Sequence, residues 1–273
     1  MQIVNGNMIN NMKSALLRIL VPLFCLILLS SHNSLAATNS RNLTIFAEPN
    51  MVLVMTKIAQ IYSKKANVII AINFNPPSDS VDNIDLGEPA DLFISAHPEW
   101  ITTLTQKGLA DVYNSGYVAS DKLVLVTSTS NKNVPKELLN GEISFEESMQ
   151  ILNKNKATLI LDYEGNSSGK FSNDVINKSN LLQLKLFKKL AEDRSPILNI
   201  LRAHQNNYAL LLASQVKEDV SFKILATTNA QNIYYQALVI AGDHMKIARE
   251  FLNFLKGSEA SAIFEKHGFN VDL

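Results

Sequence analysis

The feature that most constrains the fold is an alternation of short apolar strands with amphipathic helices. The segment 90–96, ADLFISA, is apolar almost throughout. The run 51–65 instead places its apolar side chains on one helical face. Strands that are apolar on both faces are typical of parallel sheets that are covered by helices. The pattern therefore predicts an α/β fold in which each sheet is mostly parallel.

The alternation falls into two sets and a short third block. The first set contains apolar strands at 42–46, 67–74 and 90–96. The second contains strands at 122–128 and 157–163, and helices at 179–191 and 195–205. A third block follows from residue 232 onward, which suggests that the chain crosses between two lobes, and the sequence contains no internal repeat or low-complexity tract. We therefore expect two lobes with a ligand cleft between them, at the carboxyl ends of the strands. The predicted boundaries are 37–121 with 231–273 for lobe I, and 122–230 for lobe II, joined by crossing strands near 119–123 and 226–234.

The N-terminal segment, residues 1–36, is predicted to be a signal peptide. Lys13 and Arg18 precede an apolar run at 19–29, which is the order of a secretory signal. The alternative is an uncleaved membrane anchor, but this run is shorter than the roughly 20 residues that a spanning helix needs. Met12 is an alternative start to the first methionine.

The cleavage site follows from small residues near the end of this segment. Ser34 and Ala36 occupy the −3 and −1 positions, so we expect cleavage between Ala36 and Ala37 and a periplasmic protein. Cys25 is the one cysteine of the chain, and Phe24 before it is too large for a lipid-attachment motif. The exported chain would then have neither a disulfide nor thiol chemistry.

Charge balance limits the classes of partner. The chain has 25 Lys and Arg residues and 25 Asp and Glu residues, so its formal net charge at pH 7 is zero. No overall field attracts nucleic acid or an anionic membrane. A charged ligand must therefore be recognised by a local site, and we expect no nucleic-acid partner.

Motifs for catalysis or for metal binding do not occur in the sequence. The chain lacks the HExxH spacing of zinc sites and the G-x-S-x-G motif of hydrolases. The loop EGNSSGK does not match the spacing of a phosphate-binding loop. We therefore predict a binding protein without a metal or cofactor, rather than an enzyme. The five histidines are scattered, at His32, His97, His204, His244 and His267.

Three loops between strands and helices are candidates for ligand contacts. Each is rich in turn formers or small polar residues, and each follows an apolar strand; they are 47–50, 75–80 and 164–170. Asn50, Ser78 and Ser168 could simply cap the helices that follow. Three such loops at strand carboxyl ends, spread over both lobes, also favour a ligand cleft.

The motif GEPADLFISAHPEW, at 87–100, makes the prediction more specific. It resembles the G-x-PADxFISAD-xW signature of the periplasmic molybdate-binding proteins, the substrate-binding components of molybdate ABC transporters. The opening LTIFAEPNM, the strand DKLVLV and the ending LNFLKGSEASAIFEKHGF also resemble that family. The resemblance runs from about Leu43 to Phe269. It implies the two-lobed type II periplasmic binding-protein fold, with an oxyanion held by hydrogen bonds in a hinged cleft.

The resemblance also implies which positions contact the ligand. Asn50 stands at the first serine of the family, and Pro77 stands at the second with Ser78 beside it. Ser168 stands where the family uses a backbone N–H, and Arg194 stands where a valine supplies another. The tyrosine of the family falls on a fifth position, which is Leu212.

Several of these positions have changed their chemistry. Pro77 supplies neither a hydroxyl nor an N–H, and Leu212 offers only apolar surface, whereas Asn50 can donate through its amide. Arg194 adds a charge suited to carboxylate or phosphate if it points into the cleft, and lies in solvent if it is on the rim. Glu48 would repel an anion unless it pairs with Arg194 or points away.

These positions lead to a functional hypothesis with alternatives. The first is capture of a small oxyanion, molybdate or tungstate, by a monomer that delivers it to an ABC transporter permease. In the second, the cleft has been remodelled for a different, organic anion. A third is a sensor without a role in transport. An enzyme ranks last, because no motif supports it.

Overall fold

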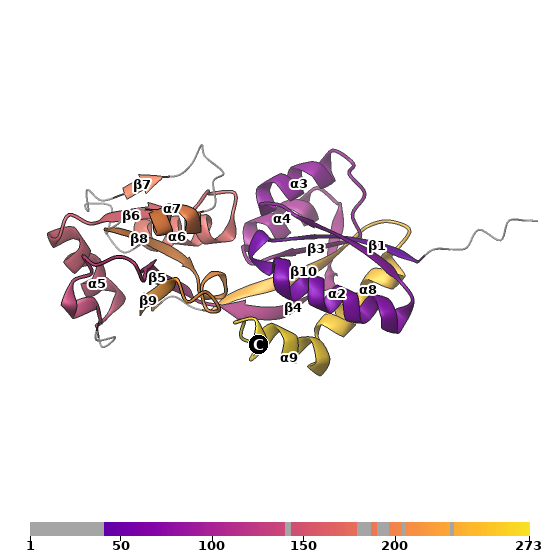
Figure 1. The fold of residues 1–273 in the computed structure, drawn as a ribbon. Coiled ribbons are helices and arrows are strands. Elements are labelled where there is room, and N and C mark those ends of the chain that lie inside the picture. Colours follow the sequence, from indigo (N-terminus) through magenta and orange to yellow (C-terminus); the bar gives the residue numbers. More distant parts are fainter. Residues whose placement is uncertain (1–40, 140–142, 179–186, 190–196, 204–205, 230–231) are drawn as a thin grey trace, which may run out of the picture. The chain divides into compact units, whose positions relative to one another are not determined.

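The strands of the chain form two five-stranded sheets in the computed structural model. The structure describes residues 41–139, 143–178, 187–189, 197–203, 206–229 and 232–273. Arg41–Leu273 belong to one compact unit (Figure 1). The signal-peptide prediction for residues 1–36 lies outside the described residues.

The first sheet has the order β2-β1-β3-β10-β4. Its strands come from two separate stretches of the sequence, because β10 is supplied by the end of the chain. These strands are β1 (Asn42–Ala47), β2 (Ile69–Phe74), β3 (Leu92–Ser95), β4 (Ala110–Asp121) and β10 (Ile233–Ile240).

The second sheet has the order β7-β6-β8-β5-β9. It is built from one continuous stretch. The strands are β5 (Leu123–Ser128), β6 (Thr158–Leu161), β7 (Phe187–Lys189), β8 (Asn207–Leu212) and β9 (Phe222–Thr227).

Within the described residues, each sheet has one strand that runs against the other four. In the first sheet, β10 pairs antiparallel with both β3 and β4, while β1 pairs parallel with β2 and β3. In the second, β5 pairs antiparallel with β8 and β9, while β6 pairs parallel with β7 and β8. These two strands are the first ones formed after each passage between the sheets. The predicted mostly parallel arrangement is thus combined with one reversed strand in each sheet.

Helices cover both faces of each sheet. On the first sheet, α3 and α4 pack on one face around Phe46 and Phe93, while α2, α8 and α9 pack on the other around Ile58 and Phe251. On the second sheet, α7 packs on one face, and α5 and α6 pack on the other. The α-helices are α2 (Val52–Ala66), α3 (Pro77–Asp85), α4 (Pro98–Gln106), α5 (Phe145–Lys154), α6 (Ser167–Lys178), α7 (Ile197–Ala203), α8 (Met245–Leu255) and α9 (Ser258–Lys266). The short 3-10 helices are η1 (Pro49–Met51), η2 (Lys136–Leu139) and η4 (Ala213–Gln215).

Local sequence signals explain where several helices begin and end. Pro77 and Pro98 occupy the first positions of α3 and α4, where a missing N–H costs nothing. Helix α2 ends at Ala66, and the capping residue that follows, Asn67, has a φ of 51°, the left-handed conformation that asparagine tolerates well. Ser144 and Glu147 form a reciprocal capping box at the start of α5.

One predicted helix is wrong in part. The segment 179–191 has an amphipathic pattern that predicts a helix, but its described part, Phe187–Lys189, is the strand β7. This strand pairs in parallel with β6, so ladder hydrogen bonds along the sheet edge override the local helical pattern. Of the long strand β4, the prediction includes only the end, as the crossing strand near 119–123, because residues 111–117 are exposed or half-buried and lack a run of apolar side chains.

Candidate functional site

Glu48 lies at the centre of the candidate site. It follows β1 directly and is 3% exposed. Its Oε1 accepts three hydrogen bonds, from Ser95 Oγ at 2.8 Å, Ala96 N at 2.6 Å and Ser167 Oγ at 2.5 Å. Ser95 and Ala96 come at the carboxyl end of β3, and Ser167 begins α6 over the second sheet. One carboxylate therefore bridges segments of both sheets.

Burial determines the electrostatics of this carboxylate. Loss of solvent raises the pKa of Glu48, and the hydrogen bonds from Ser167, Ala96 and Ser95 oppose that rise. The charge of Asp121 raises the pKa further. Among the described residues, no lysine or arginine pairs with Glu48. The carboxylate is therefore held by neutral donors alone in this part of the chain.

A second polar group forms around Asp121, at the end of β4. Burial raises the pKa of Asp121 to about 6, while hydrogen bonds from Ser214 and from the backbone N–H of Lys122 hold it down. Ser214 also accepts a hydrogen bond from Asn50 Nδ2 at 3.1 Å. The same amide donates to the hydroxyl of Tyr235 at 2.5 Å. Asn50, the predicted ligand contact, thus joins η1 to η4 and to β10.

Ser78 and Pro77 contribute to a contact between backbones. Pro77 is buried at the start of α3. The Ser78 N–H donates to the Gly165 carbonyl at 3.3 Å, and the Ser78 hydroxyl donates to Asp79 Oδ1 at 3.2 Å. A side chain at Gly165 would collide with Ser78 Oγ and with the ring of Tyr163. Glycine at this position therefore permits the close approach of the two loops.

Ser168, Leu212 and Arg194 complete the predicted set. The Ser168 hydroxyl donates to Asp162 Oδ2, so this side chain is directed within its own loop. Leu212 ends β8 and is 1% exposed, and its N–H donates to Gln215 Oε1 at 2.8 Å. Arg194 lies outside the described residues. The structure thus places Glu48, Asn50, Ser78 and Ser168 where strands give way to helices, and the described hydroxyls and amide bind protein groups.

Two cavities lie near Glu48. We call the first the Asn50 cavity; its volume is about 490 Å³, and Asn50, Asp162, Asn166 and Ser214 supply polar groups to it. Apolar side chains from the start of α2 and from α7 complete its wall. Of the described residues, no lysine or arginine lines this cavity, and Asp162 is its one charged group. Its volume falls in the range of pockets for small organic molecules.

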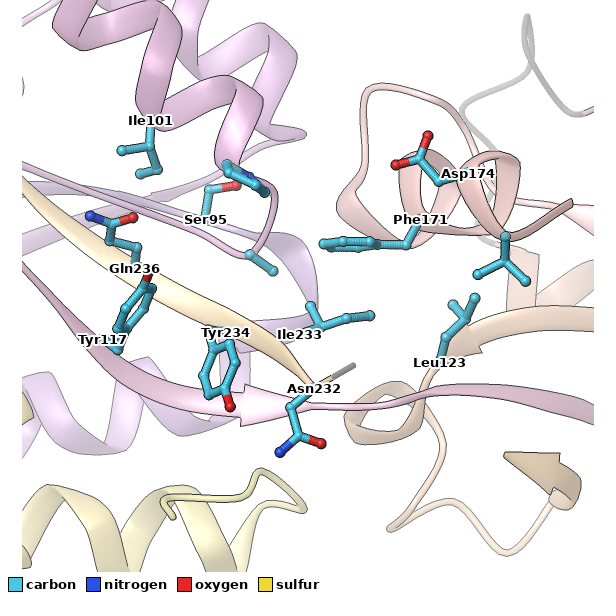
Figure 2. A pocket seen from close by; sticks show the side chains of 13 residues that line it. Ser95, Ile101, Tyr117, Leu123, Phe171, Asp174, Asn232, Ile233, Tyr234 and Gln236 are labelled. Carbon is cyan, nitrogen blue, oxygen red and sulfur yellow. The ribbon is translucent and has the colours of Figure 1, made fainter. Parts of the chain in front are cut away.

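The second, the Tyr117 cavity, has a volume of about 450 Å³ (Figure 2). Tyr117 and Tyr234 project from β4 and β10, with their ring centres 5.4 Å apart. Phe171 and Asp174 reach it from α6. Asp174 lies 3.7 Å from His97 Nε2, and burial lowers the pKa of that histidine. Aromatic and aliphatic side chains therefore line much of this cavity, and Asp174 is the one carboxylate among its described residues.

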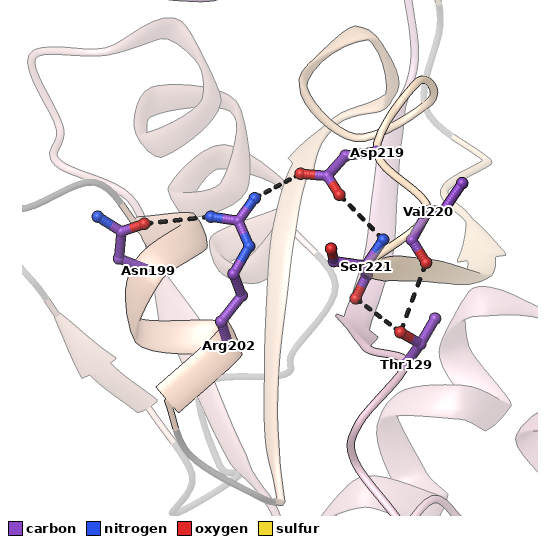
Figure 3. A network of polar contacts seen from close by, with 6 residues as sticks. All are labelled: Thr129, Asn199, Arg202, Asp219, Val220 and Ser221. Carbon is purple, nitrogen blue, oxygen red and sulfur yellow. Dashed lines mark hydrogen bonds and ion pairs between the residues drawn. The ribbon is translucent and has the colours of Figure 1, made fainter.

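A further polar network is structural. Arg202 on α7 forms an ion pair with Asp219 and donates to Asn199 Oδ1 at 3.1 Å (Figure 3). Asp219 also accepts from the Ser221 N–H at 2.9 Å, and the hydroxyl of Thr129 donates to the Ser221 carbonyl at 3.1 Å. The network ties α7 to the loop before β9. It does not contribute to the walls of the Tyr117 cavity or of the Asn50 cavity.

Sequence reasoning missed four residues that organise the site: Ser95, Ser167, Asp121 and Tyr235. Ser95 is a polar residue at the end of an otherwise apolar strand, and this is a usable signal. Ser167 sits beside the predicted Ser168 in the same loop. Nothing local in the sequence distinguishes Asp121 or Tyr235, because their importance comes from burial near distant groups.

Two other kinds of feature are missing from the described residues. Within the described ranges, no group of three or more His, Cys, Asp or Glu side chains could hold a metal ion. In the same ranges, no helix has the length and apolar character needed to cross a bilayer.

Comparison with known proteins identifies relatives along almost the whole described chain. The family model described as bacterial extracellular solute-binding protein matches residues 43–270. The molybdate-binding protein ModA of Escherichia coli K12 is 24% identical over 244 residues, which cover 86% of this chain and 91% of that protein.

Solved structures share the architecture. The periplasmic molybdate-binding protein of Azotobacter vinelandii matches with a TM-score of 0.64 and 16% identity, over 85% of this chain and 100% of that one. The tungstate ABC transporter structure from Geobacter sulfurreducens matches with a TM-score of 0.69 and 13% identity, over 82% and 98%. These matches confirm the predicted type II periplasmic binding-protein fold.

Proposed function

Because the chain belongs to the bacterial extracellular solute-binding proteins, we propose that it is the periplasmic solute-binding component of an ABC transporter. In this role it would capture a small solute as a monomer and deliver it to a membrane permease. The family match over residues 43–270 is the observation that carries this proposal. The signal peptide predicted from the sequence of residues 1–36 is consistent with export.

Two ligand classes follow from different observations. The relatives named for molybdate support a small oxyanion. The buried carboxylate of Glu48 favours the second class, an organic solute. Three hydrogen-bond donors that could bind an oxyanion are already bound to this carboxylate. A dianion beside Glu48 and Asp121 would also be repelled by any charge that they carry.

We place the organic solute in the Asn50 cavity. Its amide and hydroxyl groups can accept or donate hydrogen bonds, and its apolar wall suits a carbon skeleton. A solute that contacts both predicted lobes would bind the closed state more tightly than the open state, and it would therefore favour closure. Whether the solute carries a carboxylate depends on Arg194, which is the candidate cation from the sequence.

Titration calorimetry on the mature protein tests the proposal. The panel contains molybdate, tungstate, sulfate, small mono- and dicarboxylates, and neutral polar solutes. We expect heat from an organic solute and none from the three oxyanions. Tight molybdate binding would contradict the organic-solute assignment but keep the transport role. Absence of binding across a broad panel, with the protein folded, would contradict solute capture itself.

Arg194→Ala separates an anionic from a neutral solute. If the ligand is a carboxylate held by this side chain, its affinity falls at least tenfold. Arg202→Ala is the matched control, since Arg202 serves the structural network with Asp219. Equal affinities for all three proteins would assign the ligand to the neutral class.

A further inference from the structure

The Glu48 carboxylate is bound in the way that proteins bind a free carboxylate. A single oxygen receives two hydroxyl donors and one backbone N–H, all within 2.8 Å. The donors converge from the end of β3 and from the start of α6. They are neutral, and the start of a twelve-residue helix adds the favourable end of its dipole.

We propose that the side chain of Glu48 permanently occupies an anion-binding site. It thereby excludes free anions from this site and connects α6 to the first sheet. Ser95, Ala96 and Ser167 form the site. This role of Glu48 does not depend on which solute the protein binds.

Burial explains why this side chain occupies the site so firmly. A carboxylate that is 3% exposed has lost its hydration and needs these hydrogen bonds in return. A free anion would have to displace Glu48, and the displaced group has no described cation nearby to receive it. The second buried carboxylate, Asp121, makes the surroundings still less favourable for an added anion.

The contact also joins distant parts of the chain. Ser167 lies 119 residues from Glu48 in the sequence, and Ser95 lies 47 residues away. Ser78 N–H to Gly165 carbonyl and the Lys170–Glu99 ion pair join the same two regions. Of these three connections, the one that Glu48 makes is buried, so water does not compete for its hydrogen bonds.

Replacing Glu48 with alanine gives a direct test, because of the atoms that are removed. The substitution deletes the γ-carbon and the carboxyl group, which together correspond to acetate. The three donors would remain, around a space of the right size for that ion. Acetate should therefore bind to Glu48→Ala and fill the site, whereas Glu48→Gln keeps the volume filled with a neutral group.

Thermal unfolding with sodium acetate, against sodium chloride at equal ionic strength, reads out this binding. We expect acetate to raise the melting temperature of Glu48→Ala and to leave the wild type and Glu48→Gln unchanged. Adding Ser167→Ala to Glu48→Ala should weaken the acetate affinity about tenfold or more, because one hydrogen bond to the charge is lost.

Two results would overturn the proposal. One is a folded Glu48→Ala protein that gains no stability from acetate. The other is an equal acetate response in the wild type. If Glu48→Ala folds poorly, its refolding yield is compared in the two salts, and a yield that acetate does not raise counts equally against the proposal. The solute panel on the wild type is a separate experiment, so failure of transport and failure of this site are distinguishable.

Discussion

The buried carboxylate of Asp121 predicts an unusual dependence of stability on pH. Its pKa rises from an ordinary 3.8 to about 6 in the folded protein, chiefly because burial disfavours the charged form. The folded state therefore binds the proton more tightly than the unfolded state does. Between pH 3.8 and pH 6, this group stabilises the fold as the pH falls, and its contribution is lost as the pH rises through about 6.

The magnitude follows from the same values. Each pKa unit corresponds to about 1.36 kcal/mol, so the interval from 3.8 to about 6 corresponds to about 3 kcal/mol. Asp121→Asn removes the titration while keeping Oδ1, which accepts from the N–H groups of both Lys122 and Ser214. Relative to the wild type, the variant should thus gain about 3 kcal/mol between pH 4 and pH 7.

Urea unfolding at a series of pH values measures this difference. Groups that do not interact with Asp121 titrate alike in both proteins, so subtraction of the two free energies of unfolding leaves the contribution of Asp121 together with its coupling to Glu48 and Tyr235. Asp272→Asn, at an exposed position near the C-terminus, controls for the loss of one charge. A difference that stays flat from pH 4 to pH 7, or that falls, would refute the assignment of a buried, poorly solvated carboxylate at this position.

Two further substitutions test the loops around the site. Gly169→Ala should cost about 1–3 kcal/mol in urea unfolding, because its new methyl group would collide with backbone carbonyls, whereas Gly242→Ala meets no atom within 4 Å and should change stability by less than about 0.5 kcal/mol. Equal costs would contradict this packing. Asn50→Ala should cost about 1–3 kcal/mol in the same assay, because the buried hydroxyl of Tyr235 loses its donor, and an unchanged midpoint would contradict that contact.

Much of the fold was predictable because its signals are local. An apolar strand such as 90–96 is recognised from the run of apolar residues itself, and the start of a helix is recognised from a residue such as Pro98. The prediction of a helix failed for the described part of 179–191 because its structure depends on a distant partner. Its helical pattern is real, but pairing with β6 decides the outcome, and this partner is more than twenty residues away in the sequence.

The places of the candidate residues in the fold were predictable, but the hydrogen-bond partners of their side chains were not. The sequence placed Asn50, Ser78 and Ser168 in segments between strands and helices, and in the structure they lie in η1 and in the first turns of α3 and α6. Each donor is nevertheless directed to a protein group: Asn50 to Tyr235, Ser168 to Asp162. A family motif fixes the path of the backbone, whereas hydrogen-bond partners depend on which residues arrive from elsewhere.

Glu48 shows this distinction most sharply. From the sequence, an acid two residues before a predicted ligand contact can repel a ligand, pair with Arg194 or point away. The structure adds another arrangement, in which the acid turns inward and takes the donors itself. That choice depends on Ser95 and Ser167, which reach it from 47 and 119 residues away. Because a buried carboxylate without such donors would be too costly to keep, Glu48 and its three donors have to be explained as one unit.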